Sequence, residues 1–324
     1  MAQRITYSLL TRGEKDKPKE MYREMKRQVR TMRRKNNTGS EEPVVDVSEM
    51  KSWDARLPNM HQLLLSENFE CQRYAQEVFE ILGDDDPAPL RSLEYWIDQR
   101  FPNTESYVTN PKQLCKIVSA LSINIYLLLR TILDDEEYLQ TITEQSDHVD
   151  FFDKLVLMKG GKDWKLRLHI FTPDSLSTVQ EGLHSHRNHF VSSCLYGKIQ
   201  QGIWEPCAEN DTESVAFKQY EYDPVVSEDG KVFNLKKHDD DIYMRESRIE
   251  STYAGQKYYM HPSVIHKVTM VSGHTVTLVL NSRNVMKKSC FCSEDDWYDP
   301  QHLRPKFTLE QTRAVINKVV GLIK

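Results

Sequence analysis

The stretch from residue 183 to residue 190, LHSHRNHF, decides how the rest of the sequence is interpreted. Apolar and small residues follow it as far as Gly197, a pattern typical of a β-strand. Side chains two residues apart on a strand point to the same face, so we expect His184 and His186 to project into one cavity. Two neutral imidazoles fixed side by side form half of a mononuclear metal site. A polar strand edge that carries histidines by chance is the alternative interpretation.

A second β-like segment supplies a third histidine. Residues 255–268 read GQKYYMHPSVIHKV and contain both His261 and His266. The two segments together resemble the motifs of the cupin superfamily, with paired histidines on one strand and a proline-containing turn that leads to a last histidine on another. The resemblance implies a small antiparallel β-barrel with the metal near one mouth. The distance from Pro262 favours His266 over His261 as the third ligand.

The glutamate ligand of most cupins is missing from this chain. The cupin pattern places it shortly after the second histidine, where Phe190 and Val191 stand here. The resemblance therefore implies a three-histidine site, as in the thiol dioxygenase branch typified by cysteine dioxygenase. It covers roughly residues 150–285 and includes a histidine and a phenylalanine after the pair, here His189 and Phe190.

The chain departs from cysteine dioxygenases in the strand after the third ligand. Those enzymes carry Ser-x-His-x-Tyr there, whereas residues 277–281 of this chain read TLVLN. Val279 cannot form a side-chain hydrogen bond, and Asn281 cannot supply a phenolic proton. We therefore expect a small polar or anionic substrate other than free cysteine.

Three neutral ligands on one face of a metal leave up to three adjacent positions open. The site keeps the 2+ charge of the ion, which favours anionic substrates. The resemblance implies Fe(II) with dioxygen as co-substrate, although imidazoles also accept other divalent transition metals. The predicted function is an Fe(II)- and O₂-dependent oxygenase that acts on a small metabolite. The alternatives are an isomerase or lyase in which the metal is only a Lewis acid, and a ligand-binding regulatory cupin whose basic N-terminal arm contacts a partner.

Three further side chains are candidates for catalysis. Arg167 offers a bidentate clamp for a substrate carboxylate, unless its alternation with Leu166 and Leu168 places it on the outer face of its strand. Tyr259 precedes the third ligand and is a candidate proton donor, although tyrosines in a barrel are more often packing residues. His189 has the opposite strand parity from the ligand pair, which favours a place behind the ligands or on the surface.

The pattern of apolar residues predicts an α+β fold with four parts. Helical periodicity gives way to short alternating strands after Phe151, and it returns at the C-terminus. We expect a basic arm and linker, a helical domain, an antiparallel β-barrel of cupin or jelly-roll type, and a C-terminal helix, at residues 1–50, 51–150, 151–305 and 306–324.

Several elements are predicted within these parts. Helices are expected at 66–82, with Ser66 as N-cap, at 89–101, and at 111–133, where the apolar middle predicts a buried central helix. The acidic segment 205–245 is expected to form added strands or a lid over the mouth of the barrel.

Composition and charge narrow the cellular setting of this 324-residue chain. The six cysteines are scattered, which favours reduced thiols and a cytoplasmic location. The first residues do not form a signal peptide pattern, and the longest uncharged apolar stretch, 117–129, is short for a membrane span.

Two further motifs point to weaker possibilities. Residues 12–35 contain eleven lysines and arginines against four acids, but no aromatics are interleaved in the basic run 26–35 for base stacking, so we expect no nucleic-acid partner. Cys290 and Cys292 with the distant His302 supply too few zinc ligands, and free thiols are expected.

Overall fold

The computed structural model describes residues 69–83, 86–101, 111–149, 151–173, 182–227, 230–294 and 305–323. The expected basic arm at 1–50 and the expected N-cap at Ser66 lie outside these residues. The domain boundaries expected from the sequence stay predictions. The described residues all belong to one unit that extends from Met60 to Ile323.

The described helices begin and end close to sequence signals. Pro89 opens one helix without losing an intrahelical hydrogen bond, and Asp135 caps another by accepting from the amide of Tyr138. Thr308 and Gln311 form a reciprocal capping box at the start of the C-terminal helix, which is confirmed. The helices are α2 (Phe69–Gly83), α3 (Pro89–Arg100), α4 (Pro111–Ile123), α5 (Ile125–Asp134), α6 (Glu136–Gln145) and α7 (Leu309–Leu322).

The single helix predicted over 111–133 is wrong, because the chain bends by 67° between α4 and α5. Asn124 lies at the bend and is buried. Its side-chain amide donates to the carbonyls of Ala120 and Ala75, both at 2.9 Å. These bonds hold a polar side chain inside the core and fix the break. The expected burial of this region is confirmed on both helices.

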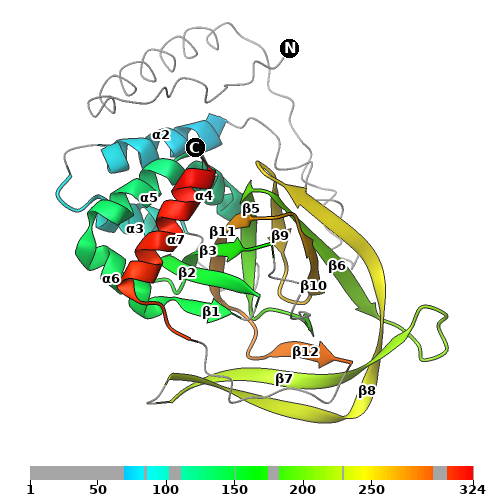
Figure 1. Cartoon of the computed structure of the whole chain (residues 1–324). Helices are drawn as coiled ribbons and strands as arrows, with labels where there is room; N and C mark the ends of the chain where they lie inside the picture. The colour runs from blue at the N-terminus through cyan, green and yellow to red at the C-terminus, as the bar shows by residue number, and fades with distance from the viewer. Residues whose placement is uncertain are drawn as a thin grey trace, which may run out of the picture. The chain divides into compact units, whose positions relative to one another are not determined.

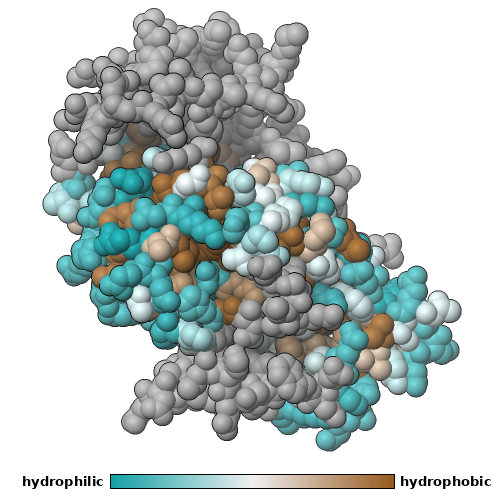
Figure 2. Space-filling view, in the orientation of Figure 1, coloured by the Kyte–Doolittle hydropathy of each residue, from teal (hydrophilic) through white to brown (hydrophobic). Residues whose placement is uncertain are grey.

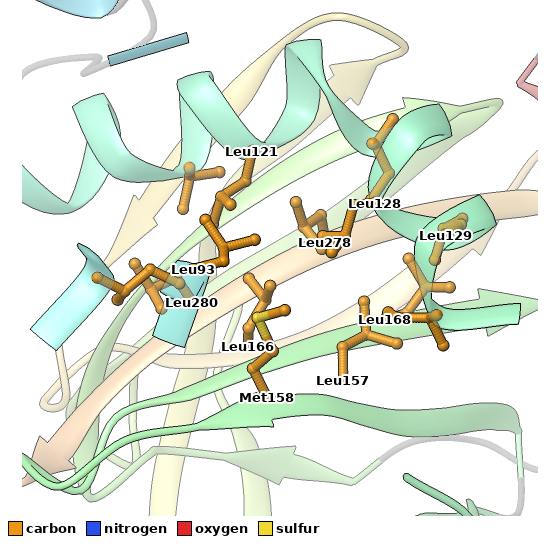
Figure 3. Close-up of a cluster of buried hydrophobic side chains, with 14 of the residues drawn as sticks. Leu93, Leu121, Leu128, Leu129, Leu157, Met158, Leu166, Leu168, Leu278 and Leu280 are labelled. Carbon is orange, nitrogen blue, oxygen red and sulfur yellow. The ribbon is translucent and has the colours of Figure 1, made fainter. Parts of the chain in front are cut away.

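The first sheet has six antiparallel strands, and helices cover one of its faces (Figure 1). Leucines at alternate positions of its central strands pack with helix residues such as Leu121 and Leu128 in one apolar cluster (Figure 3). Helices and first sheet therefore share a core. The strand order is β1 (Asp147–Val149), β2 (Phe152–Lys159), β3 (Lys165–Phe171), β11 (Thr275–Asn284), β5 (Asn188–Tyr196) and β9 (Lys257–Met260).

The second sheet is also antiparallel, and its pairings run from β10 through five strands and back to β10. The shortest member has two residues and lies between β10 and β12. The acidic segment 205–245 contributes strands to this sheet, as one of its two interpretations predicts. The order is β10 (Ile265–Val271), β4 (Leu183–His184), β12 (Ser289–Ser293), β7 (Val215–Ser227), β8 (Gly230–Tyr253) and β6 (Lys198–Pro206).

The prediction that His184 and His186 lie on one strand is wrong. β4 ends at His184 and pairs in the second sheet, whereas β5 starts at Asn188 and pairs in the first. Residues 185–187 cross between the two sheets. Arg187 holds the end of this crossover, because its carbonyl accepts from the amides of Val285 and Met286 at 2.7 and 2.9 Å.

The mixture of helices and antiparallel sheets confirms the α+β class. The described surface seen in Figure 2 is largely hydrophilic, with scattered apolar residues. Among the described residues, α4 and α5 have the length and composition of a membrane span only when taken as one bent pair, and no helix has them alone.

Leu278 gives a test of the shared core. Its side chain is fully buried in the first sheet against the helices (Figure 3). We expect Leu278→Ala to lower the free energy of unfolding by about 2–5 kcal/mol, because it leaves a cavity that the packed helices cannot fill. Ile249, which is 55% exposed, is the control, and its change to alanine should alter stability by less than about 0.5 kcal/mol. Urea unfolding measures both, and equal effects would contradict this description of the core.

Candidate metal centre

Three histidines from separate parts of the chain converge in the structure. His184 lies on β4, His186 on the crossover, and His266 on β10. One ligand atom from each lies within 4.8 Å of the other two, and no other group of histidine, cysteine or acidic residues in the described ranges meets this test. The ring centroids are 4.6 to 5.1 Å apart. These are the three residues that the sequence selects as metal ligands.

Backbone pairing brings the three rings together. His184 lies opposite His266 where β4 pairs with β10. The amide of His186 donates to the carbonyl of Pro262, so the turn before β10 contacts the crossover. Ser185 is fixed on the other side, since its amide donates to the carbonyl of Cys290 and its hydroxyl accepts from the amide of the same residue, both at 2.9 Å. His184 and His186 are therefore positioned by contacts with neighbouring strands, and no single strand carries both.

Hydrogen bonds to the outer ring nitrogens determine the tautomers. The Nδ1–H of His266 donates to the side-chain carbonyl of Gln201 at 2.7 Å, inside the protein. The Nδ1–H of His184 donates to the backbone carbonyl of Gly182 at 3.1 Å. An oxygen acceptor at Nδ1 leaves Nε2 with a lone pair, which is how proteins orient histidine ligands toward a metal. His184 and His266 are thus prepared to bind through Nε2.

The closest contact in the cluster fits a cation. Nε2 of His186 lies 2.9 Å from Nε2 of His266. The single ring proton of neutral His266 is already donated to Gln201, so its Nε2 offers only a lone pair. A second lone pair facing it would be repulsive. A proton on His186 or a positive ion shared by the rings removes this repulsion, so the residues present fit a metal.

Burial keeps two of the rings neutral. It lowers the pKa of His186 well below the usual range, and His184, His266, Arg167 and His169 lower it further. Burial, with a contribution from His184, does the same to the pKa of His266. Neutral imidazole is the form that coordinates a metal.

Arg167 and His169 lie on the face of β3 that points away from the helices. Leu166, Leu168 and Ile170, which alternate with them, belong to the apolar cluster under the helices. Both polar residues act electrostatically on His186. Arg167 therefore lies on the inner face of its strand, in the space between the two sheets. Strand alternation therefore puts Arg167 and His169 together on the sheet face opposite the helices, and both act on His186 from there.

The sequence interpretation gave no role to His169 and Ser192. Nε2 of His169 and Oγ of Ser192 are buried and have no hydrogen-bond partner in the described structure. Both lie on the inner face of the first sheet, on β3 and β5. Burial lowers the pKa of His169 well below its usual range, as do Arg167 and Lys154. The signal available in the sequence was the regular alternation of polar and apolar residues along β3.

His189 and Tyr259 are not brought to the cluster. They share a hydrogen bond of 2.5 Å between His189 Nδ1 and the Tyr259 hydroxyl. Tyr259 lies opposite Val191 and packs with it against the core beneath the helices. Burial raises the pKa of Tyr259. The structure thus places these two candidate catalytic residues on the helix-covered face.

Two other expectations concern residues near the site. His261 is held by Ser263, with 2.7 Å between Nδ1 and Oγ, and it is not among the converging rings. All six cysteines are free thiols. Cys290 and Cys292 lie side by side on β12, whereas His302 falls outside the described residues.

Comparison with known proteins yields only distant structural similarities. No protein-family model and no curated protein matches the chain. An oxalate decarboxylase from Bacillus subtilis is 10% identical over 43% of this chain, with a TM-score of 0.25, and the chain covers 27% of that enzyme. A cupin-like protein from Thermotoga maritima is 12% identical over 43% of the chain and 77% of its own length, with a TM-score of 0.23.

A hydroxypropylphosphonic acid epoxidase from S. wedmorenis is 10% identical, covers 65% of this chain and 96% of its own length, and has a TM-score of 0.24. Similarities this distant assign neither a family nor an activity. We therefore base the function on the geometry of the site.

The imidazole of His169, whose Nε2 is buried, predicts a pH dependence of stability. Its pKa is lowered in the folded state, so below about pH 6.5 the unfolded chain binds a proton that the folded chain does not. Stability contributed by this group is complete above that pH and is lost as the pH falls. We expect His169→Gln to reduce the loss by up to about 1.4 kcal/mol per pH unit.

Urea unfolding of metal-free protein between about pH 7.5 and pH 5.5 measures this loss. The control is His238→Gln, because the His238 side chain is 37% exposed on β8. An unchanged pH slope in His169→Gln would show that His169 is not held neutral by the fold.

Proposed function

We propose that this chain is a cupin-type mononuclear metal enzyme, with His184, His186 and His266 as ligands of a divalent ion. The convergence of three imidazoles within 4.8 Å carries the proposal. Two of them present Nε2 inward because oxygen acceptors occupy Nδ1. Among the described residues, no carboxylate belongs to this group. The ligand set is therefore neutral, and a bound ion keeps its full charge.

The proposed reaction is the O₂-dependent oxidation of a small anionic metabolite in the cytoplasm, with Fe(II) as the preferred ion. His184, His186 and His266 would hold the iron, which would supply the redox chemistry by which dioxygen oxidises a substrate bound beside it. The choice of iron and of oxidation rests on the resemblance of the two histidine segments to the three-histidine cupins. We propose no membrane or nucleic-acid partner.

Residues around the histidines prepare the site for an anion. Arg167 contributes a positive charge that acts on His186, and it is proposed to bind a substrate carboxylate. His169 and Ser192 add buried polar atoms on the same sheet face. Phe190 packs its ring edge-on against His186, with centroids 4.9 Å apart, and this apolar wall keeps water from the ligands. Binding, orientation and exclusion of water are the roles assigned to these residues.

Metal content tests the ligand assignment. We expect His184→Ala, His186→Ala and His266→Ala each to lose most of the metal that the purified protein binds, because the donor set falls to two. His189→Ala should keep it, since His189 bonds to Tyr259 on the helix-covered face. Elemental analysis measures the metal. Thermal unfolding with and without a chelator provides a second readout, because a ligand at 100 times its Kd adds about 2.7 kcal/mol. Full metal occupancy in His266→Ala would refute the assignment.

Dependence on dioxygen tests the reaction class. Oxygen consumption by iron-loaded protein is measured against a panel of small thiols, hydroxy acids and diols that includes cysteine. We expect uptake with a compound other than cysteine, loss of turnover under strict anaerobiosis, and recovery on aeration. Undiminished anaerobic turnover would instead identify an isomerase or lyase that uses the ion as a Lewis acid. Efficient oxidation of cysteine would contradict the expectation drawn from Val279 and Asn281.

A further inference from the structure

Two thiols lie side by side on the strand next to His184. Cys290 and Cys292 are two residues apart on β12, so their side chains share a face, and their sulfur atoms are 3.4 Å apart. Cys292 is fully buried in an apolar cluster with Leu183 and Met244. Cys290 is partly exposed and accepts from the side-chain amide of Gln219. Cys290 is therefore the more exposed of the two residues, and the sulfur of the buried Cys292 lies next to its own.

This strand is the main support of β4. Phe291, between the two cysteines, lies opposite His184, and Cys292 lies opposite Leu183. Ser185 adds two hydrogen bonds to the backbone of Cys290. On its other edge β4 has a single register partner, His266 of β10. A distortion of β12 therefore acts on the segment that carries His184.

We propose that Cys290 and Cys292 form a redox-active dithiol whose oxidation to an intrastrand disulfide displaces β4 and weakens metal binding. The disulfide and the displacement follow from the cysteine geometry, and the effect on metal rests on the proposed function. The proposed modification is oxidation of the two thiols, and the proposed oxidant is a low-molecular-weight disulfide such as glutathione disulfide.

The displacement follows from the dimensions of a strand. Residues two apart on an extended strand are separated by about 6.4–6.8 Å, at 3.2–3.4 Å per residue. In a disulfide the two Cβ atoms lie about 3.5–4.5 Å apart and the sulfur atoms about 2.05 Å apart, whereas Cβ atoms on the same face of an extended strand are about as far apart as its Cα atoms. Closing the bond therefore shortens and puckers β12 around Phe291. Because Phe291 is the register partner of His184, the distortion falls on the pairing that positions this ligand.

The exchange reaction balances without another co-reactant. The sulfur of Cys290, the more exposed residue, attacks one sulfur of the oxidant as thiolate, forms a mixed disulfide and releases one small thiol. The Cys292 sulfur then attacks the Cys290 sulfur, and the second small thiol leaves. The two protons of the protein thiols end on the two released thiols. The protein pair loses two electrons, and the oxidant's disulfide bond gains them.

Peptide mass spectrometry after incubation of the full chain with glutathione disulfide tests the bond. We expect the peptide containing both cysteines to lose two hydrogen atoms, and dithiothreitol to restore them. Cys290→Ser and Cys292→Ser should lose the response. Cys207→Ser, which removes another partly exposed thiol, should keep it. Failure of wild-type protein to form the bond under conditions that oxidise free dithiols overturns the proposal.

Hydrogen–deuterium exchange measures the displacement without any metal. The amides of Ser185 and His186 donate to Cys290 and Pro262, so their exchange should become faster on oxidation and return on reduction. Unchanged exchange in fully oxidised protein overturns the coupling between β12 and β4.

Metal binding provides the last readout. We expect oxidation to weaken the affinity for Fe(II) or Co(II) by about tenfold or more, the size of effect that displaced supporting groups have on metal sites. Equal affinity in the two redox states contradicts this part of the proposal. Absence of metal binding in both states refutes the proposed function instead, while the mass and exchange results still decide whether the dithiol acts on β4.

Discussion

The passage of the chain from one sheet to the other at residues 185–187 is the constraint on which the site depends. Backbone groups in such a crossover need hydrogen-bond partners, because they belong to neither ladder. Cys290, Pro262 and the amides of Val285 and Met286 supply these partners from distant parts of the sequence. The same bonds that satisfy the crossover fix His184 and His186 beside His266. The donor group is therefore complete only when both sheets are formed.

The two faces of the first sheet explain why the polar interior is stable. Its leucines pack under the helices, and each fully buried leucine contributes about 1.5–3 kcal/mol. This apolar face supplies the free energy that offsets buried polar atoms on the opposite face. A buried hydrogen-bonding atom without a partner costs about 1–3 kcal/mol, as at His169 and Ser192. Such a cost is expected where a fold keeps groups ready for a ligand.

Two features of the histidine cluster bear on the redox proposal: two of its rings are neutral, and the strand β4 beside them is short. Burial and mutual repulsion keep His186 and His266 uncharged, so both are ready to coordinate an ion without first losing a proton. Their arrangement nonetheless depends on β4, a strand of two residues. Two of the rings are neutral and ready to bind an ion, but His184 lies on this short strand. A change in the neighbouring strand β12 can therefore alter metal binding. The Cys290–Cys292 pair lies on that neighbour.

The sequence by itself determined the α+β class, several helix boundaries and the three histidines, because periodicity, caps and ligand chemistry are local or depend on residue type. Asn124 and Ser185 are examples of what could not be predicted from the sequence. An asparagine inside an apolar run gave no sign that its amide would bend the helix toward Ala75, and a serine between two histidines gave no sign that it would pair with Cys290. Tyr259 and His189 were selected by their nearness in sequence to the ligands, yet strand alternation placed them beneath the helices. Only the tertiary structure decided these outcomes, because each depends on a partner that lies tens of residues away and is chosen by packing.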